Sequence, residues 1–290
     1  MSAVVVIIIA LAVWLGSWAL NEYLVRLKPA GPAAERQIGF IVPAIFGLCL
    51  LALWELLTRG LAIPEILLPA PSIIVEAAAN SLPIIAVDVW QTVFKEVLPG
   101  YAIGCGAGLI AAFLIDRSPF LKAGLLPLGN LVSALPIVGL APIMIMWFGF
   151  EWPSKAAIIV TMIFFPMLIN TITGLTAAGH MERDLMRTYA ASWPQTLLKL
   201  RLPAAWPFIF NALKINSTLA MIGAIVAEFF GSPSVGMGFR ISTEMGRMNT
   251  AMVWAEILAA AIAGSLFYGI VALIERKVTF WHPSVRGGQR

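Results

Sequence analysis

Few side chains in this sequence have a type and spacing that could support catalysis. His180 and His282 stand alone, and Cys49 and Cys105 lie in separate apolar stretches without Cys-x-x-Cys spacing. We interpret both cysteines as small buried hydrophobic residues and both histidines as solvated or interfacial side chains. The sequence has no metal-ligand cluster, no carboxylate pair placed for acid–base work and no Ser/His/Asp arrangement. These observations argue against an enzyme.

A glycine-rich loop, Gly231 to Gly238 (GSPSVGMG), superficially resembles a phosphate-binding loop. No Lys-Ser or Lys-Thr pair follows Gly236, so the loop lacks the side chains that contact nucleotide phosphates and magnesium. We do not interpret it as a nucleotide site. Glu228 lies just before this loop near the end of an apolar stretch, where a buried acid is costly. A gate in a transport path and an ion pair or helix-end hydrogen bond explain this acid equally well.

The segment Asp184 to Pro207 (DLMRTYAASWPQTLLKLRLPAAWP) is a basic stretch between two apolar ones. Read at helical spacing, its beginning and the two residues before it have an apolar face and a polar face. The apolar face comprises Leu185, Met186 and Tyr189, and the polar face comprises Glu182, Arg183, Arg187 and Thr188. This pattern predicts a short amphipathic helix.

A second short helix is predicted directly after the first. Ser192 can cap it, Pro194 is acceptable in its first turn, and Pro203 is expected to stop it. Residues Leu198 to Leu202 (LKLRL) also alternate with period two, but a lone strand would leave its edge unpaired, so we prefer a helix. From periodicity alone, two interpretations stay open: an interfacial helix on anionic lipid and a docking element for a partner protein.

The composition is that of a polytopic membrane protein. Of the 290 residues, 60% are hydrophobic and 12% are charged. We therefore expect an all-α transmembrane bundle of about seven spans, each needing about 20 mostly apolar residues. The first stretch lacks a basic region before it and is kept as a helix rather than a signal peptide. The spans are predicted at Val4–Val25, Ile38–Leu57, Val89–Ile115, Leu125–Phe148, Ala156–Leu175, Phe208–Phe230 and Met252–Ile274.

The basic residues predict the orientation of these spans, because cytoplasmic loops retain Lys and Arg. An orientation with the N-terminus outside and the C-terminus inside places only a minority of the 19 basic residues outside. Those are Arg59, Lys95, Lys155, Arg240 and Arg247; the cytoplasmic set is Arg26, Lys28, Arg36, Arg117, Lys122, Arg183, Arg187, Lys199, Arg201, Lys214, Arg276, Lys277, Arg286 and Arg290. Such single basic residues scattered among loops do not indicate nucleic-acid binding.

Several spans carry residues that shape a helix. Proline interrupts the fourth and fifth spans, and glycine recurs in the third, where the missing side chains let another helix approach. The prolines are Pro136, Pro142 and Pro166, and the glycines are Gly100, Gly104, Gly106 and Gly108. We predict close helix packing at the glycines, with contact to a ligand as the alternative.

The segment DLMRTYAASWPQTLLKLRLP resembles the EAA loop of ABC importer permeases. Asp184, Leu185 and Met186 occupy the Glu-Ala-Ala places, and Ala190 occupies the glycine place. The motif ends on Leu200, Leu202 and Pro203. The resemblance implies that a separate ATPase subunit contacts this loop. The contact residues would be Asp184, Leu185, Met186, Arg187, Tyr189, Ala190, Ala191, Ser192, Leu202 and Pro203. The basic residues Arg183, Arg187, Lys199 and Arg201 would form ion pairs with the ATPase and with lipid.

Other segments extend the resemblance to the nitrate, sulfonate, taurine and pyrimidine-precursor branch of these permeases. They are ILLPAPSIIVEA (66–77), ALPIVGLAPIMIMWFGFEWPSK (134–155), IVAEFFGSPSVGMGF (225–239) and IERKVTFW (274–281). The first span is an addition to the usual six-helix form of this family. The expected organisation is N-terminal helices and the Leu-Pro-x-Pro-Ser segment over 1–85, a permease core over 86–280 with the coupling loop near 182–203, and a cytoplasmic tail over 281–290.

What this resemblance implies is a permease of a bacterial inner membrane that hydrolyses nothing itself. Its partners would be two ABC ATPase subunits, a second permease copy in a homodimer, a periplasmic or extracellular solute-binding protein, and membrane lipid. No cofactor is expected on this chain, since ATP and Mg²⁺ would bind in the ATPase. Nucleotide-driven closure of two ATPases would draw the short helices together and rock the attached spans.

The translocation path is expected along the fourth and sixth spans. The candidate residues are Pro136, Met144, Met146, Asn216, Ser217, Thr218, Met221 and Glu228. No Lys or Arg falls near the middle of a span and the path is rich in Met, which favours a neutral heterocycle such as a pyrimidine or flavin vitamin precursor over sulfonate, taurine or nitrate. A secondary transporter, the main rival, is expected to show related halves and ionisable groups at the midplane, and this sequence shows neither.

Overall fold

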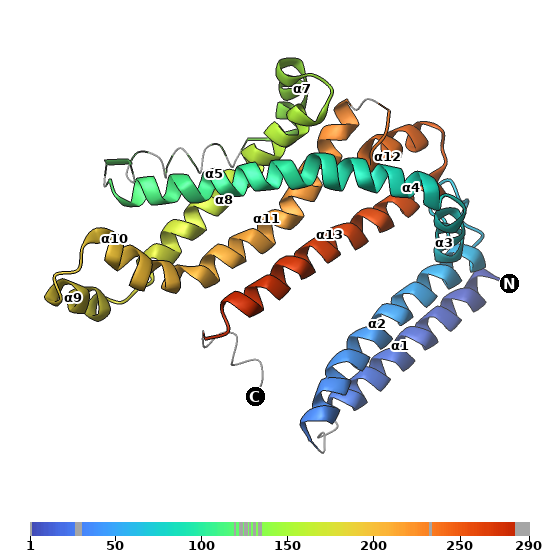
Figure 1. The fold of residues 1–290 in the computed structure, drawn as a ribbon. Coiled ribbons are helices and arrows are strands. Elements are labelled where there is room, and N and C mark those ends of the chain that lie inside the picture. The colour runs from blue at the N-terminus through green and yellow to red at the C-terminus, as the bar shows by residue number, and fades with distance from the viewer. Residues whose placement is uncertain are drawn as a thin grey trace. The chain divides into compact units, whose positions relative to one another are not determined.

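The computed structural model describes residues 2–26, 31–118, 135–231 and 234–281, with single positions between 119 and 134. These described residues are helical or form short connections between helices (Figure 1). The chain divides into two compact units. The first comprises residues 1–82 and 243–255, and the second comprises residues 83–242 and 256–290. We describe each unit by itself.

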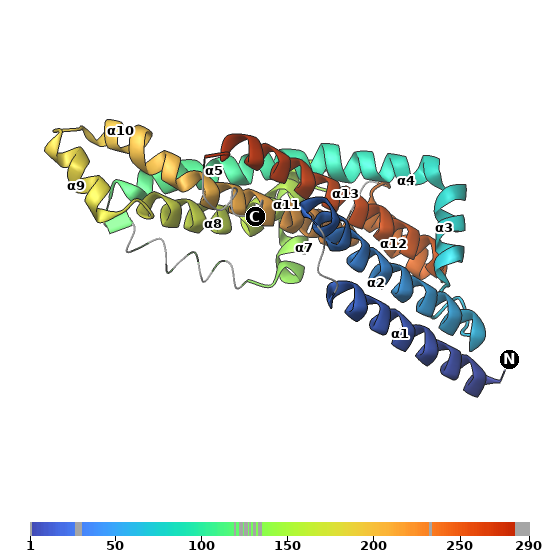
Figure 2. The same cartoon turned by 90° about the horizontal axis from the view of Figure 1, so that it is seen from below.

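The first unit is built around a hairpin of two long helices. Helices α1 (Ala3–Arg26) and α2 (Pro32–Gly60) lie side by side in Figures 1 and 2. Gly60, at the end of α2, meets Val6 near the start of α1, and a Cβ there would come within 2.9 Å of Val6 Cγ2. The two helices are therefore antiparallel, as expected for spans joined by a short loop.

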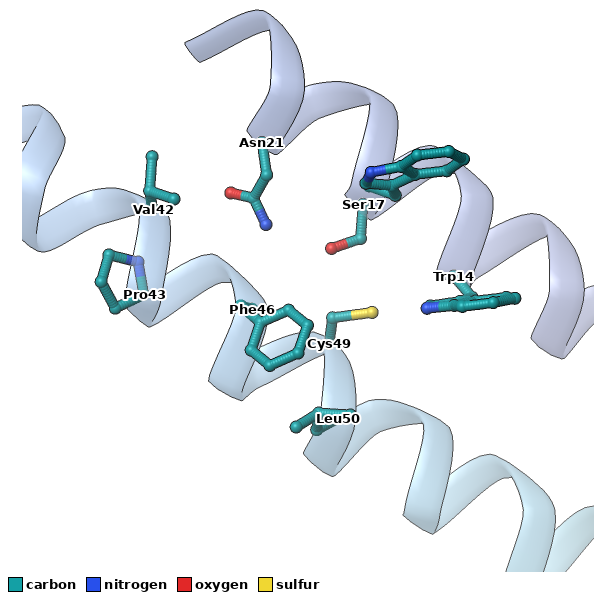
Figure 3. A pocket seen from close by; sticks show the side chains of 9 residues that line it. Trp14, Ser17, Asn21, Val42, Pro43, Phe46, Cys49 and Leu50 are labelled. Atoms are coloured by element: carbon teal, nitrogen blue, oxygen red, sulfur yellow. The ribbon is translucent and has the colours of Figure 1, made fainter. Parts of the chain in front are cut away.

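A cavity of about 670 Å³ lies between the two helices of the hairpin (Figure 3). Its walls are mostly apolar, with polar side chains from α1 among them. The lining residues are Trp14, Ser17, Trp18, Asn21, Val42, Pro43, Phe46, Cys49 and Leu50. The cysteine thiol is buried here, as the sequence predicts for a small hydrophobic residue.

The Pro-Ser segment of the first unit begins helix α3 (Pro71–Asn80). The Ser72 backbone N–H donates to Glu55 Oε2 at 3.0 Å and its hydroxyl donates to Glu55 Oε1 at 2.7 Å. Arg59 Nη2 donates to the same hydroxyl oxygen at 2.7 Å and also pairs with Glu55. A single serine therefore ties the first turn of α3 to the end of α2.

The second unit contains a bundle whose central members are α5 (Leu98–Asp116), α8 (Trp152–Thr176) and α11 (Leu202–Phe230). Its buried core joins side chains from all three helices, including Cys105, Ile163 and Met221. Helix α7 (Ile137–Phe148) packs on α8 and α11. Helix α13 (Thr250–Val278) begins in the first unit. Its Phe267 ring contacts the Tyr101 ring edge-on, with the two ring centres 4.8 Å apart.

Glycines of α5 allow close approach to α8, as the sequence predicts. A Cβ on Gly100 would lie 2.9 Å from Ile159 Cβ, and one on Gly108 would lie 2.7 Å from the Phe164 carbonyl oxygen. Gly104 makes an equally close approach, whereas Gly106 has nothing within 4 Å. Three of the four glycines therefore form the helix contact.

Six of the described helical stretches are long and apolar enough to cross a membrane. They are Ala3–Arg26, Gln37–Gly60, Leu82–Asp116, Trp152–Thr176, Trp193–Phe230 and Thr250–Val278. The prediction of a polytopic all-α bundle is confirmed. For the predicted fourth span, the described part is the shorter apolar helix α7, and much of the remainder lies outside the described residues. Helices α7 and α8 continue through Pro142 and Pro166.

Within the described residues, two π-helical stretches interrupt the regular hydrogen bonding, and each ends directly before a Leu-Pro pair. Stretch η1 (Trp90–Val97) follows α4 (Leu82–Val89) and precedes Leu98-Pro99. Stretch η2 (Leu197–Arg201) precedes Leu202-Pro203. Proline has no N–H to donate, and its ring crowds the carbonyl four residues back. One extra residue per turn before the proline, as in a π-helix, relieves this conflict without ending the helix. The N–H groups of both leucines accordingly reach back five residues.

Candidate functional site: a protruding helix and its anchorage

Helix α9 (His180–Thr188) and helix α10 (Trp193–Thr196) lie beyond the ends of α8 and α11 in both views (Figures 1 and 2). A tight turn joins them. Ala190 has a φ of 49°, and the N–H of Ala191 donates to the Met186 carbonyl at 3.0 Å. The position that matches the family's glycine thus adopts the left-handed backbone that glycine favours. The predicted first amphipathic helix is confirmed.

The second helix begins where the sequence predicts it. Ser192 stands at its N-cap, its N–H donates to Gln195 Oε1 at 2.8 Å, and Pro194 lies in the first turn. The prediction that Pro203 stops this helix is wrong. The helix runs on from Trp193 to Phe230, with Pro203 in the first turn of α11. Because η2 contains an extra residue, the helix continues although Pro203 has no N–H to donate.

The apolar face of α9 is exposed. Leu185 is 54% exposed, Tyr189 is 75% exposed, and Met186 is partly buried. Met181, one turn earlier, is 85% exposed and lies on the same face, because it precedes Leu185 by four residues. Sequence reasoning missed Met181 because the interpretation of this helix began at Glu182. The signal in the sequence that could have identified it is the apolar repeat at i, i+4 and i+8, which is Met181, Leu185 and Tyr189.

The basic residues of this region divide into two groups. Arg187 and Lys199 are exposed; the former makes a 3.3 Å pair with Asp184, in which both side chains are solvent-accessible. Arg201 differs, since its side chain is only 13% exposed and its Nη1 and Nη2 atoms each donate to Asp116 at 2.7 Å. The predicted pairing of Arg201 with an ATPase or lipid is therefore wrong; its guanidinium is used inside the second unit.

The end of α5 also contacts α10. Arg117, which follows Asp116, places its guanidinium 5.4 Å from the centre of the Trp193 ring. A cation over an indole face at this distance is attracted by the ring's electron-rich surface. Two consecutive residues at the end of α5 thus hold the helix that follows the tight turn.

The other end of the second unit contains a group of buried polar side chains. Glu228 accepts hydrogen bonds from Thr92 Oγ1 at 2.8 Å and from the Gly238 N–H at 2.6 Å. Asp88 accepts from the Gly236 N–H at 2.7 Å and from Arg240 Nε at 2.8 Å. Of the two sequence-based explanations for Glu228, the structure shows the helix-end hydrogen bond.

These acceptors satisfy the start of helix α12 (Met237–Gly246), whose first N–H groups have no partner within the helix. The Met237 N–H completes the set by donating to Thr92 Oγ1 at 2.9 Å. A Cβ on Gly236 would lie 2.3 Å from Glu228 Oε1, and the φ of 129° at this position also disfavours a side chain. Two glycines of the segment that resembles a phosphate-binding loop, Gly236 and Gly238, thus donate their N–H groups to the chain's own carboxylates.

The structure separates the eight predicted path residues into two groups. Four are buried within the second unit: Asn216, Ser217, Met221 and Glu228. Asn216 Nδ2 donates to the Ile163 carbonyl at 3.0 Å, which is a packing role. Pro136, Met146 and Thr218 are exposed, and Met144 is partly buried. The role of all eight in transport stays a prediction.

Comparison with known proteins identifies the family. The family model described as "Binding-protein-dependent transport system inner membrane component" matches residues 104–280. A probable ABC transporter permease protein of Haemophilus influenzae is 31% identical over 246 residues, which cover 83% of this chain and 98% of the relative. A putative aliphatic sulfonates transport permease of Bacillus subtilis is 29% identical over 271 residues, covering 92% and 95%.

A further relative is the formylaminopyrimidine transport permease of Halalkalibacterium halodurans. It is 28% identical over 255 residues, which cover 85% of this chain and 98% of the relative. The family match spans more than half of the chain and includes α9, its turn and Glu228, whereas Asp88 lies before the matched range. The chain belongs to the binding-protein-dependent inner membrane components of ABC transport systems, and it is a membrane permease for small solutes.

Proposed function

We propose that this chain is the path-forming subunit of an ATP-driven importer and that helix α9 is its contact with a separate cytoplasmic ATPase. The observation that carries the proposal is the exposed apolar face formed by Met181, Leu185 and Tyr189 on a helix beyond the bundle. An exposed aromatic and two long aliphatic side chains on one helix face are typical of a helix that docks into a groove. ATP and Mg²⁺ would bind in that partner and not in this chain.

The charges around this face support a protein partner in the cytoplasm. Arg187 on α9 and Lys199 in η2 are exposed, so they can attract an acidic surface of the partner. The excess of basic residues predicted on this side of the membrane agrees with a cytoplasmic location. An interfacial helix on anionic lipid would bury the same face in the bilayer, so the two readings predict different partners for Tyr189.

The assembly that follows contains two copies of this chain around a two-fold axis, with two ATPase subunits and an external solute-binding protein. One copy has too few spans to enclose a path for a solute. With two copies, the two α9 helices would follow the two ATPases as these close and open.

For the solute, we propose a neutral heterocycle such as a pyrimidine or flavin vitamin precursor, with sulfonate, taurine or nitrate as the alternative. The charged side chains of the spans support this choice. Lys214 pairs with Glu275, and Arg201 pairs with Asp116, so neither cation is free to bind an anion. A relative that transports formylaminopyrimidine agrees with the first class, and one for aliphatic sulfonates agrees with the second.

The docking role is tested by Tyr189→Asp and Met186→Asp, each placing a charge on the proposed contact. We expect both variants to stay in the membrane, to lose co-purification of the ATPase and to lose ATP-dependent uptake. Met245→Asp is the matched control, since Met245 is a methionine that is 62% exposed on a different helix, α12. Unchanged co-purification and uptake in the α9 variants would refute the docking role, and uptake driven by an ion gradient without ATP would indicate a secondary transporter.

The solute is tested with cells that express the complete transport system. We expect uptake of labelled riboflavin or formylaminopyrimidine and none of labelled taurine or nitrate. The opposite pattern would assign the anionic class.

A further inference from the structure

We propose that Asp116 and Arg201 form a clamp that makes the proposed coupling element move together with α5 and α8. This inference rests on the proposed function, because it concerns how displacement of α9 and α10 reaches the spans. The two residues position the coupling element and contact neither solute nor nucleotide.

The clamp joins three helices through one guanidinium. Arg201 Nη1 and Nη2 donate to the two oxygens of Asp116, each at 2.7 Å, and Arg201 Nε donates to the Leu175 carbonyl at 2.9 Å. Asp116 is the last residue of α5, and Leu175 lies at the end of α8. Two parallel charge-assisted bonds fix the relative orientation of the two side chains as well as their distance.

The location at two helix ends explains why an arginine suits this position. The last carbonyls of α8 have no partner within their own helix, and Arg201 Nε satisfies one of them. The carboxyl ends of α5 and α8 carry partial negative charge, which a cation stabilises. Asp116 adds a full negative charge there, so this acid is tolerated only while the guanidinium faces it.

The clamp differs from the other ion pair of this region in its burial. The side chains of Arg201 and Asp116 are 13% and 5% exposed, whereas those of Arg187 and Asp184 are 84% and 69% exposed. Water and salt weaken the exposed pair, but a largely buried bidentate pair keeps its geometry. A displacement of α10 therefore carries the end of α5 with it.

The helix beyond the clamp supports the same conclusion. Trp193, at the start of α10, lies under the Arg117 guanidinium, so the end of α5 contacts both the start of α10 and Arg201 at the end of η2. Helix α5 in turn packs closely on α8 through its glycines. The path for displacement runs from α9 through α10 and η2 into these two spans.

The first test measures uptake and ATP hydrolysis in the complete, reconstituted system with Asp116→Ala and Arg201→Lys. Helix α9 is untouched in both, so the ATPase should still co-purify and hydrolyse ATP. We expect uptake per ATP to fall by about tenfold in Asp116→Ala, which is within the range of single positions that couple distant sites. Arg201→Lys keeps the positive charge but not the two parallel donors of the guanidinium, so it should lose part of the uptake per ATP.

The matched control is Glu275→Gln, which breaks the Lys214–Glu275 pair of α11 and α13. Its side chains are 19% and 17% exposed, close to those of the clamp, and it is remote from α9 in the sequence. We expect a similar loss of thermal stability with unchanged uptake per ATP. A general loss of stability would lower uptake in the control as well, and that result would overturn the clamp.

The second test observes the movement directly and does not depend on the solute. Spin labels at Glu182→Cys on α9 and Leu114→Cys on α5 would be placed in one copy of a mixed assembly whose other copy carries no cysteine. Both copies would carry Cys49→Ala and Cys105→Ser, and the distance within the labelled chain would be measured by electron paramagnetic resonance. With the clamp intact, we expect one narrow distance that does not change when ATP and vanadate are added. In Asp116→Ala the distances should broaden and shift with nucleotide.

The two proposals fail in different ways. If Tyr189→Asp leaves co-purification of the ATPase unchanged, the docking role of α9 is refuted, whatever the clamp variants do. If Tyr189→Asp abolishes co-purification but Asp116→Ala keeps the narrow distance and full uptake per ATP, only the clamp is refuted. Full uptake per ATP in Arg201→Lys would show that the two-point fork is unnecessary, which also overturns the clamp.

Discussion

Gly104 of α5 lies so close to Ile163 of α8 that an added Cβ atom would come within 2.6 Å of the isoleucine Cγ1. No side chain larger than hydrogen fits between the two helices at this point. Ile163 belongs to the buried core that also contains Cys105 and Met221, so a change at this contact affects the packing of that core.

Gly104→Leu should destabilise the protein by about 1–3 kcal/mol, the usual cost of forcing extra carbons into a packed core. Gly106→Leu is the control, because a Cβ at Gly106 meets nothing within 4 Å. Thermal unfolding of both variants in the same detergent would show a lower midpoint for Gly104→Leu alone. Equal midpoints would mean that the α5–α8 contact is looser than the structure shows.

Ala190→Gly should stabilise the turn after α9. The φ of 49° is unfavourable for alanine by about 1–2 kcal/mol, whereas glycine adopts it freely and loses only about 0.5–1 kcal/mol of unfolded-state entropy. We expect slower hydrogen exchange at the Ala191 N–H, which closes the turn. Ala191→Gly, outside the left-handed region, should loosen the same turn. Faster exchange in Ala190→Gly would contradict this account.

Glu228→Ala should release the start of α12. Two donors, the Thr92 hydroxyl and the Gly238 N–H, would lose their acceptor, and each buried unsatisfied group costs about 1–3 kcal/mol. Hydrogen exchange at Gly238 should accelerate strongly. Glu228→Gln keeps one acceptor oxygen and should have a smaller effect. If both variants exchange at the wild-type rate, the carboxylate does not hold this helix.

Pro203→Ala should displace Arg201 from Asp116. Alanine restores an N–H that can donate to the Lys199 carbonyl, which removes the extra residue of η2 and turns the preceding helix by about 100°. Uptake per ATP should then fall as in Asp116→Ala. Pro99→Ala makes the same local change after η1, away from the guanidinium, and should leave the coupling ratio near the wild-type value. Wild-type coupling in Pro203→Ala would contradict this prediction.

The sequence predicts the helical fold and the close α5–α8 packing because both depend on local patterns. About 20 apolar residues suffice to indicate a span, and glycine at every fourth position of α5 indicates a helix contact. The short helix α9 and the cap at Ser192 are local features of the same kind. Their positions therefore follow from spacing alone.

The anchorage of the candidate site could not be predicted, because its partners are distant in the chain. Arg201 meets Asp116 across 85 positions, and Glu228 meets Thr92 across 136. A basic residue beside an amphipathic helix has the same local pattern whether it faces a partner protein or its own bundle. The prediction that Pro203 ends the second helix failed for a related reason. A proline that ends a helix and a proline that follows a π-helical stretch have the same local sequence pattern.

The unbroken helix from Trp193 to Phe230 has a mechanical consequence. At 1.5 Å per residue its 38 residues extend for about 57 Å, nearly twice the ~30 Å thickness of the hydrocarbon layer. One rod thus reaches from the region beside α9 to the carboxylate that holds α12. A rod pivoting inside the bilayer swings its two ends in opposite directions, so a push at one membrane face arrives at the other as a pull.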